Sequence, residues 1–224
     1  HHAHPNDPAR DPDMRPEVFS VHAPWPPGRR GILRVARQYQ AWLLPCGLLF
    51  WTFALRGNGL VYALRHTREA RADIASIMLH AGLWLAVPVA LLGPGAGLVN
   101  YFVISGLIGV YLGALFIPNH VGMPIVSEGE VQSYLIQQTM TARNFGGSGL
   151  VAFLAGGLDS QIEHHLVPQI PNLRLRQARA VVREFCARRD LPYREAGYFA
   201  IWRDVLAHFH RIGRTAADPK RGSR

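Results

Sequence analysis

The fold is decided by two apolar runs, IASIMLHAGLWLAVPVALL at residues 74–92 and AGLVNYFVISGLIGVYLGALFI at residues 96–117. They hold 19 and 22 residues and contain no Asp, Glu, Lys or Arg. An α-helix rises 1.5 Å per residue, so 19 residues extend about 29 Å, close to the roughly 30 Å hydrocarbon core of a bilayer. Residues 74–117 therefore predict a transmembrane helical hairpin that turns at Gly93-Pro94-Gly95. The alternative, two buried helices of a soluble core, fits these lengths less well.

Arginines mark one side of this hairpin. The loop before it, residues 56–73, carries Arg56, Arg65, Arg68 and Arg71. Because basic residues favour the cytoplasmic side, we expect the hairpin to leave the cytoplasm and return to it. A further apolar run, residues 41–55, is short for a span and has arginines near both ends, so we interpret it as an interfacial or re-entrant helix. Residues 1–40 and 118–213 then lie together on the cytosolic face.

The composition favours lipid over nucleic acid as the partner of this chain. Its formal net charge is +9 and its mean hydropathy is +0.04, a value typical of soluble proteins. That average conceals the apolar middle third. A basic chain can bind nucleic acid or anionic lipid, and the apolar runs favour lipid, so we expect no nucleic-acid partner. The polar C-terminal part predicts helices at about 173–189 and 196–211, and residues 214–224 are expected to form a disordered tail.

Three histidine-bearing segments lie outside the apolar runs. They are His1-His2-Ala3-His4-Pro5-Asn6 with Asp11-Pro12-Asp13 after it, Pro118-Asn119-His120, and Leu158-Asp159-Ser160-Gln161-Ile162-Glu163-His164-His165. In a helix, Gln161, His164 and His165 stand at i, i+3 and i+4 and share one face. Neutral imidazoles bind iron, copper, zinc or nickel, and two adjacent histidines with a third donor one turn earlier can bind a metal pair. Without other context, such a pair is more often two surface histidines.

The context is a resemblance to a known family. QIEHH, with Gly-Gly-Leu before it and a proline after it, resembles the third histidine box of membrane front-end acyl desaturases, in which Gln replaces the first His of HxxHH. His1-His2-Ala3-x-Pro5-Asn6 with Asp-Pro-Asp resembles the end of the second box, H-x-x-H-H-A-x-P-N. Other segments resemble family landmarks in family order: Asn119-His120-x-Gly122-Met123-Pro124, Thr141-Ala142-Arg143-Asn144, Pro171-Asn172-Leu173 and Leu191-Pro192-Tyr193. The resemblance extends to about residue 213.

This resemblance implies an all-α integral membrane enzyme, a fatty-acyl desaturase, with a transmembrane hairpin and a cytosolic, histidine-rich helical cap. The boxes would hold two iron ions that activate O2 to introduce a C=C bond into an acyl chain. Carried over by position, the iron ligands are His1, His2, His120, His164 and His165. Gln161, Asp159 and Asn144 would be weaker ligands or would support the ligands. The implied partners are membrane lipid, a fatty-acyl substrate carried by CoA, carrier protein or lipid, and an electron-transfer protein of ferredoxin or cytochrome type.

Some features depart from this pattern. The first box, H-x(3–4)-H, and the first His of the second box lie outside these 224 residues, so we expect the chain to be an incomplete, inactive fragment. A di-iron hydroxylase of a lipid substrate, or a non-catalytic membrane protein with a relic metal site, are the alternatives. His80 lies inside the first apolar run, where ionisable groups often mark functional sites. A neutral His80 hydrogen-bonded within the helices is the simpler interpretation.

Overall fold

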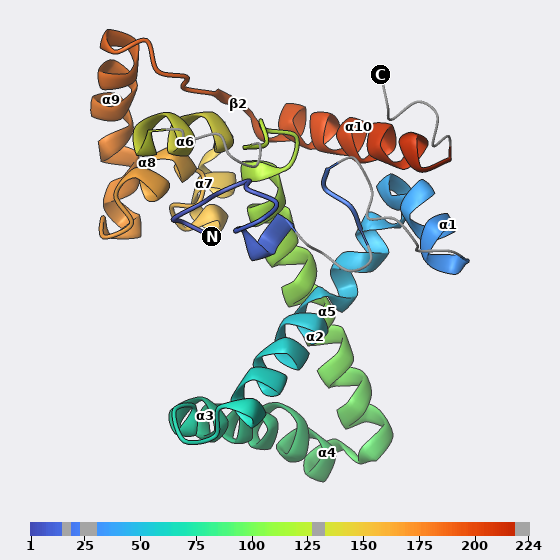
Figure 1. Cartoon of the computed structure of the whole chain (residues 1–224). Helices are drawn as coiled ribbons and strands as arrows, with labels where there is room; N and C mark the ends of the chain where they lie inside the picture. The colour runs from blue at the N-terminus through green and yellow to red at the C-terminus, as the bar shows by residue number, and fades with distance from the viewer. Residues whose placement is uncertain (15–18, 23–30, 127–132, 218–224) are drawn as a thin grey trace. The chain divides into compact units, whose positions relative to one another are not determined.

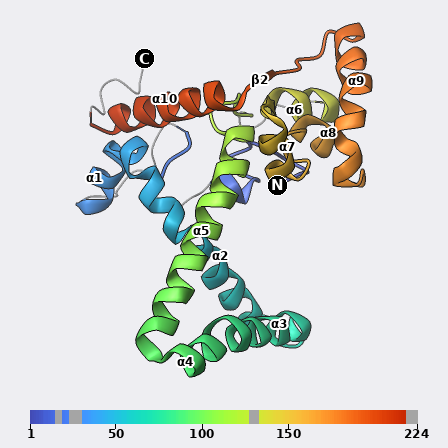
Figure 2. The same ribbon diagram turned by 180° about the vertical axis from the view of Figure 1, so that it is seen from behind.

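The computed structural model describes residues 1–14, 19–22, 31–126 and 133–217. The chain folds into two compact units, and both are mainly helical, as the sequence predicts (Figures 1 and 2). We call residues Leu44–Ala114 the apolar unit. Residues His1–Leu43 and Leu115–Arg224 form the other, which we call the histidine unit.

The apolar unit is built from three helical stretches. They are α2 (Gln40–Arg65), α3 (Arg71–Ala81) with its continuation through a π-helical turn (Gly82–Ala86) into α4 (Val87–Leu92), and α5 (Pro94–His120). In this unit α2 and α5 cross and then diverge, and α3 with α4 forms the third side (Figures 1 and 2). The stretches Arg71–Leu92 and Pro94–His120 are each long and apolar enough to cross a membrane, and they contain the two predicted runs.

The turn between these two stretches depends on glycine. Gly93 ends α4 with φ 83° and ψ 162°, a backbone conformation that residues with a side chain rarely adopt. Pro94 begins α5, where its missing N–H group costs nothing because the first helical N–H groups have no partner within the helix. A Cβ atom on Gly97 would lie 2.5 Å from the Cα of Val89, so α4 and α5 are in close contact just beyond the turn.

Small residues also bring α5 close to α2. A Cβ atom on Gly109 would lie 2.2 Å from the carbonyl oxygen of Leu48, and one on Gly113 would lie 2.4 Å from a methyl group of Leu48. Glycine at these positions lets the two backbones approach, as at many helix crossings in membranes. The packing of the apolar unit therefore relies on missing side chains as well as on apolar ones.

The second helix differs from the prediction in length. The apolar run at 41–55 predicts a short helix, whereas α2 continues to Arg65. The extension includes residues 60–64, LVYAL, in which Leu and Ala favour helix and offset the low propensity of Gly57 and Gly59. The interfacial or re-entrant placement of 41–55 stays a prediction.

The histidine unit contains the first residues of α2 and the last residues of α5, together with several further elements. These are a 3-10 turn (Pro12–Met14), α1 (Ile32–Gln38), α6 (Tyr134–Thr141), α7 (Gly149–Ala155), α8 (Gln161–Leu166), α9 (Asn172–Arg188) and α10 (Tyr198–Ala217). The helix α8 contacts both α6 and α9, and α1 lies along α10 (Figures 1 and 2). The helices predicted at about 173–189 and 196–211 correspond to α9 and α10.

Two details correct the expected all-helical fold. Strands β1 (Asn144–Gly146) and β2 (Glu195–Gly197) pair in parallel, and three-residue strands are too short to show an alternating pattern in the sequence. Residues 214–217, expected to begin the disordered tail, continue α10. That helix is anchored by the buried side chains of Ile201, Val205 and Phe209, so its last turn extends an already formed helix. Residues 218–224 lie outside the described residues.

Candidate metal centre

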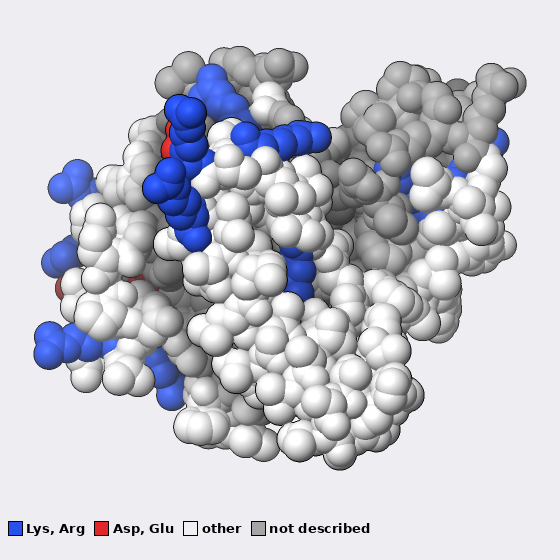
Figure 3. Space-filling view, turned by 90° about the horizontal axis from the view of Figure 1, so that it is seen from below, with Lys and Arg blue, Asp and Glu red and all other residues white. Residues whose placement is uncertain are grey.

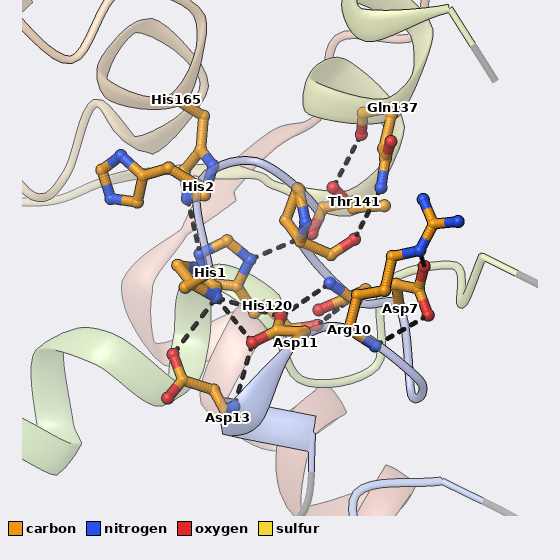
Figure 4. A network of polar contacts seen from close by, with 12 residues as sticks. His1, His2, Asp7, Arg10, Asp11, Asp13, His120, Gln137, Thr141 and His165 are labelled. Atoms are coloured by element: carbon orange, nitrogen blue, oxygen red, sulfur yellow. Dashed lines mark hydrogen bonds and ion pairs between the residues drawn. The ribbon is translucent and has the colours of Figure 1, made fainter. Parts of the chain in front are cut away.

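Five histidine rings from three segments meet in the histidine unit. His1 and His2 come from the N-terminal segment, His120 ends α5, and His164 and His165 lie on α8. The ring of His165 lies 4.7 Å from that of His2, 4.8 Å from that of His120 and 5.1 Å from that of His1, measured between centroids. The rings of His2 and His164 are 4.7 Å apart. In Figure 4 the rings of His1, His2, His120 and His165 lie together. The structure thus brings together every histidine that the sequence predicts as a ligand.

Hydrogen bonds from buried amides hold the N-terminal segment in place. Asn6 has φ 56° and is buried, and its side-chain amide donates to the carbonyl oxygens of His120 at 3.2 Å and Pro124 at 3.1 Å. The Gln138 amide on α6 donates to the carbonyl oxygen of His2 at 3.1 Å. Asn6 and Gln138 therefore determine where His1 and His2 stand relative to the end of α5.

A second set of hydrogen bonds positions α8. The Asn144 side chain accepts from the backbone N–H of Ile162 at 2.9 Å and donates to the Glu163 carboxylate at 2.8 Å. Tyr193 donates to the other oxygen of Glu163 at 2.9 Å, and Glu163 is fully buried. Asn144, expected as a weak ligand or support, thus binds the backbone and the carboxylate of α8 directly.

Gln161 links α8 to the end of α5. Its carbonyl oxygen accepts from the side-chain amide of Asn119 at 3.0 Å, and its amide nitrogen lies 3.0 Å from Nε2 of His120. The Arg143 guanidinium donates to the carbonyl oxygens of Pro118 and Val121, at 2.5 Å and 2.6 Å, and so fixes the last turn of α5. Gln161 therefore lies at the cluster itself.

Three of the five rings have one nitrogen occupied by a partner outside the cluster. Nδ1 of His1 lies 3.0 Å from the Asp11 carboxylate and Nδ1 of His120 lies 3.2 Å from the Thr141 carbonyl oxygen (Figure 4). Nδ1 of His165 lies 2.9 Å from the Gln138 amide oxygen. These partners accept, so each Nδ1 donates a proton and each neutral ring keeps its lone pair on Nε2. Metal-binding histidines are oriented in this way, with the second nitrogen donating to a carboxylate or carbonyl.

The geometry of the Nε2 atoms fits a cation. Nε2 of His120 and Nε2 of His165 are 3.2 Å apart, and both carry lone pairs that repel each other. An ion about 2.1 Å from each nitrogen and bound at a right angle would separate them by about 3 Å. Ligand atoms of His1, His120 and His165 lie within 4.8 Å of one another, and in the described part of the chain Nδ1 of His164 is buried without a hydrogen-bond partner. Imidazoles without thiolates suit iron, and also copper or zinc.

Burial lowers the pKa of four of these histidines, His2, His120, His164 and His165, and so favours their neutral form. Desolvation lowers the pKa of His165 to about 2, and the neighbouring His120 and His2 rings lower it further. Desolvation also lowers the pKa of His2 and of His164. A metal binds the neutral ring, so the cluster is ready to accept a cation at neutral pH without first losing protons.

Asp159, expected as a ligand or as support for the ligands, forms ion pairs with arginines of α9. Its carboxylate pairs with Arg179 at 3.3 Å and with Arg176 at 3.5 Å, both on α9. These arginines balance the negative charge that Asp159 brings to the segment before α8. Its role as a ligand stays a prediction.

Sequence reasoning assigned no role to Asp11, Gln138 and Thr141, the partners of the Nδ1 atoms. Asp11 has a sequence signal, because a carboxylate shortly after a box histidine is a common partner of a ligand ring. On α6, Gln138 contacts His165 through its side chain and Thr141 contacts His120 through its backbone carbonyl oxygen, and the sequence of α6 does not indicate either contact. Glu163 stands inside the quoted box, and only the fold reveals Asn144 and Tyr193 as its partners.

The described chain thus combines two helices of membrane-spanning length with a histidine cluster in which His165 is fully buried and the other four rings are half-buried. The comparison with protein families is more specific, because the fatty acid desaturase family model matches residues 1–197. This chain belongs to the fatty acid desaturase family. The resemblance seen in the sequence is thereby confirmed.

Several curated relatives have similar sequences. The Delta(5) fatty acid desaturase fat-4 of Caenorhabditis elegans is 33% identical over 122 residues, which cover 53% of this chain and 27% of that protein. The acyl-lipid (9-3)-desaturase of Physcomitrium patens is 28% identical over 188 residues, 81% of this chain and 35% of that protein. The NADPH-dependent stearoyl-CoA 9-desaturase of Mycobacterium tuberculosis (strain ATCC 25618 / H37Rv) is 42% identical over 69 residues, 31% of this chain and 16% of that protein. The chain thus spans roughly a third or less of the length of these relatives. No solved structure matches it significantly.

Proposed function

We propose that this chain forms part of a fatty-acyl desaturase whose di-iron centre is the histidine cluster. The observation that carries the proposal is the arrangement of His1, His120 and His165, whose Nδ1 atoms contact acceptors outside the cluster while one ligand atom of each ring lies within 4.8 Å of the others. Two iron ions bound there would supply the oxidising power that removes hydrogen from an unactivated acyl chain with O2. Membership of the family supports this chemistry over structural zinc.

The ligand roles follow from the contacts of each ring. His1, His2, His120, His164 and His165 hold the two irons. Asp11, Thr141 and Gln138 keep three of these rings in the tautomer that binds metal. Gln161 lies against His120 and acts as a weak ligand or as a donor to a bound group.

The electron balance requires a further partner. Removing two hydrogens from the acyl chain releases two electrons, whereas reducing O2 to two waters consumes four. An external donor of the ferredoxin or cytochrome type supplies the other two electrons together with solvent protons. The relatives' names include acyl-lipid and stearoyl-CoA desaturases, so lipid-linked and CoA-linked acyl chains are the substrates to test first.

Exposed apolar side chains support a membrane location. No side chain from α3 through α4 is buried, and Met78, Leu79 and Leu91 are 67%, 63% and 77% exposed. Figure 3 shows a broad area of white side chains, with several Arg side chains beside it. Such a surface is unfavourable in water and favourable in lipid. We infer that the two stretches cross the membrane, with Arg65, Arg68 and Arg71 and the histidine cluster on the cytoplasmic side.

Expression of the gene that encodes this chain, from its own start codon, tests the activity. The host should contain saturated acyl chains and iron, and its lipids should be analysed by gas chromatography and mass spectrometry. We expect a new monounsaturated chain with the wild type and none with His165→Ala. The matched control is His210→Ala, because His210 is exposed on α10, and it should retain the product.

Iron content gives an independent readout. The purified protein should contain iron by mass spectrometry of the metal, and His165→Ala should lose most of it while His210→Ala keeps it. A hydroxylated product would favour the hydroxylase alternative. Bound iron without any product would favour the relic-site alternative, and equal iron in both variants would contradict the ligand assignment.

A further inference from the structure

The apolar unit contains a positive charge without a negative partner. The Arg56 guanidinium on α2 donates from Nη1 to the hydroxyl of Ser105 at 2.7 Å and to that of Tyr101 at 3.1 Å, both on α5. Its carbon lies 5.5 Å from the centre of the Tyr101 ring. Among the described residues no carboxylate pairs with it. These contacts hold the guanidinium in place, but they leave its charge uncompensated, which is costly in an apolar environment.

His80 adds an unpartnered nitrogen beside this charge. It lies on α3, and its Nε2 atom is buried without a hydrogen-bond partner in the part of the chain that the structure describes. The centre of its ring lies 6.4 Å from that of Tyr101. The simpler interpretation of His80, a ring hydrogen-bonded within the helices, therefore does not account for Nε2.

Both side chains line one cavity. Its volume is about 180 Å³, and Arg56, His80, Tyr101 and Ser105 line it together with apolar residues that include Trp84 and Ile108. An engineered cavity of about 150 Å³ is known to admit benzene, so this one has room for a chemical group larger than a single ion. Its polar side chains can all donate hydrogen bonds and lie next to one another, and the remaining lining side chains are apolar.

The position of the cavity along the helices indicates what could reach it. His80 follows Arg71 by nine residues and Ser105 follows Pro94 by eleven, which correspond to about 14 and 17 Å of helix. If the stretches span the bilayer, as the proposed function holds, both positions lie near the middle of a core roughly 30 Å thick. A ligand that enters there must be soluble in the membrane. This depth rests on the proposed function, whereas the cavity and its charge do not.

We propose that the cavity binds the anionic head group of a membrane amphiphile, a carboxylate or a phosphate. Arg56 supplies the charge and its remaining N–H groups, and the Nε2–H tautomer of His80 donates to the same group. Ser105 and Tyr101 hold the guanidinium in position, and the first methylenes of the acyl chain pack against Trp84 and Ile108. None of the cluster histidines lines this cavity.

Trp84 offers a direct test of this proposal. The purified chain is reconstituted in phosphatidylcholine nanodiscs and titrated with 2-bromododecanoate, whose bromine quenches a nearby tryptophan. We expect saturable quenching that disappears in Trp84→Phe. Arg56→Met should weaken binding at least tenfold, His80→Phe severalfold, and Arg56→Lys less than threefold because the charge remains. Arg65→Met is the matched control, because it removes an exposed arginine from the same helix, and it should bind like the wild type.

Three outcomes would overturn the proposal. They are unchanged binding in Arg56→Met, equal weakening in Arg65→Met, and equally saturable quenching by 2-bromododecan-1-ol, which lacks the charge. Competition by dodecyl phosphate supports a membrane amphiphile, whereas equal competition by inorganic phosphate would assign the cavity to soluble anions and contradict the stated source. Iron content measured on the same samples separates the two proposals, because Arg56→Met should leave it unchanged.

Discussion

Glu163 is a carboxylate with no exposed surface, and its neighbours determine whether α8 can keep its place. The Asn144 amide and the Tyr193 hydroxyl donate to its two oxygens. Burial and the nearby Glu163 charge raise the pKa of Tyr193, so the phenol keeps its proton and remains a donor. The two flanking residues, Ile162 and His164, are positioned by the same contacts.

Removing the Tyr193 hydroxyl should loosen this arrangement. In Tyr193→Phe one oxygen of the buried carboxylate loses its donor, which costs about 1–3 kcal/mol. We expect a lower melting temperature and weaker iron binding, measured by thermal unfolding and by metal titration. Tyr39→Phe is the control, because Tyr39 is 52% exposed, and its melting temperature should not change. Equal melting of both variants would show that the hydroxyl does not support α8.

His208 makes the stability of the protein depend on pH. Burial lowers its pKa, although its hydrogen bond to the carbonyl oxygen of Val21 opposes the shift. Below the ordinary value of about 6.5 the unfolded chain binds a proton that the folded chain does not, so stability falls as the pH drops. We expect the melting temperature to decrease between pH 7 and pH 5, and to decrease less in His208→Gln.

The control for this prediction is His210→Gln, which changes an exposed histidine on the same helix. It should show the same pH dependence as the wild type. Iron must be removed with a chelator beforehand, so that pH-dependent loss of the metal does not contribute. The cluster histidines, whose pKa values are also lowered, then add the same pH dependence to the wild type and to both variants. Parallel curves for wild type and His208→Gln would refute the assignment.

At the scale of residues, the sequence predicts the rings but not what orients them. QIEHH identifies candidate ligands by residue type and spacing, whereas His1 and His2 are identified by the resemblance of their segment to the end of the second histidine box. Gln138 stands 27 residues before His165 and on another helix, so no local pattern connects them. Asp159 is a second example. The arginines that pair with its carboxylate lie on α9, so the local sequence around Asp159 does not show that its negative charge is balanced.

The crossing of α2 and α5 depends on Gly109, and a methyl group there should separate the two helices. In Gly109→Ala the new Cβ would lie 2.2 Å from the Leu48 carbonyl oxygen, and backbone does not yield easily. Overpacking of this kind costs about 1–3 kcal/mol. We expect a lower melting temperature in detergent. Gly57→Ala is the control, because nothing lies within 4 Å of its new methyl group and alanine favours helix. Equal destabilisation by both changes would contradict the close approach.

Length and hydropathy predict the two apolar stretches because each is a long uninterrupted run. The same criterion predicts a helix shorter than α2, because the apolar run ends at Arg56 whereas the helix continues to Arg65. In the fold Arg56 is held by hydroxyl groups of α5, which sequence alone does not reveal. The strands β1 and β2 escape prediction for a related reason, because their pairing joins residues about fifty positions apart.

Opposite sides of the membrane should be accessible at the two ends of the stretch from α3 through α4. Cys46 and Cys186 are free, so they are first replaced by Ser and Ala, and single cysteines are then introduced as Gly95→Cys and Arg68→Cys. In intact cells an impermeant maleimide should label the cysteine at position 95 only, and permeabilised cells should show label at both. If only position 68 is labelled in intact cells, the hairpin has the opposite orientation in the membrane. If both positions are labelled in intact cells, the stretch does not cross the membrane.

Because the three segments of the cluster are far apart in the chain, the order of synthesis determines when its ligands exist. His1 and His2 leave the ribosome before the apolar stretches, and these leave it before His120. Translation adds about 5–20 residues per second, so the 44 residues from His120 to His164 take about 2 to 9 s. During that interval the apolar helices are complete, whereas the last two imidazoles have not been made. With the membrane placement and the iron site that we propose, insertion into the lipid would begin before iron is acquired, and a cell short of iron would accumulate an inserted apoprotein.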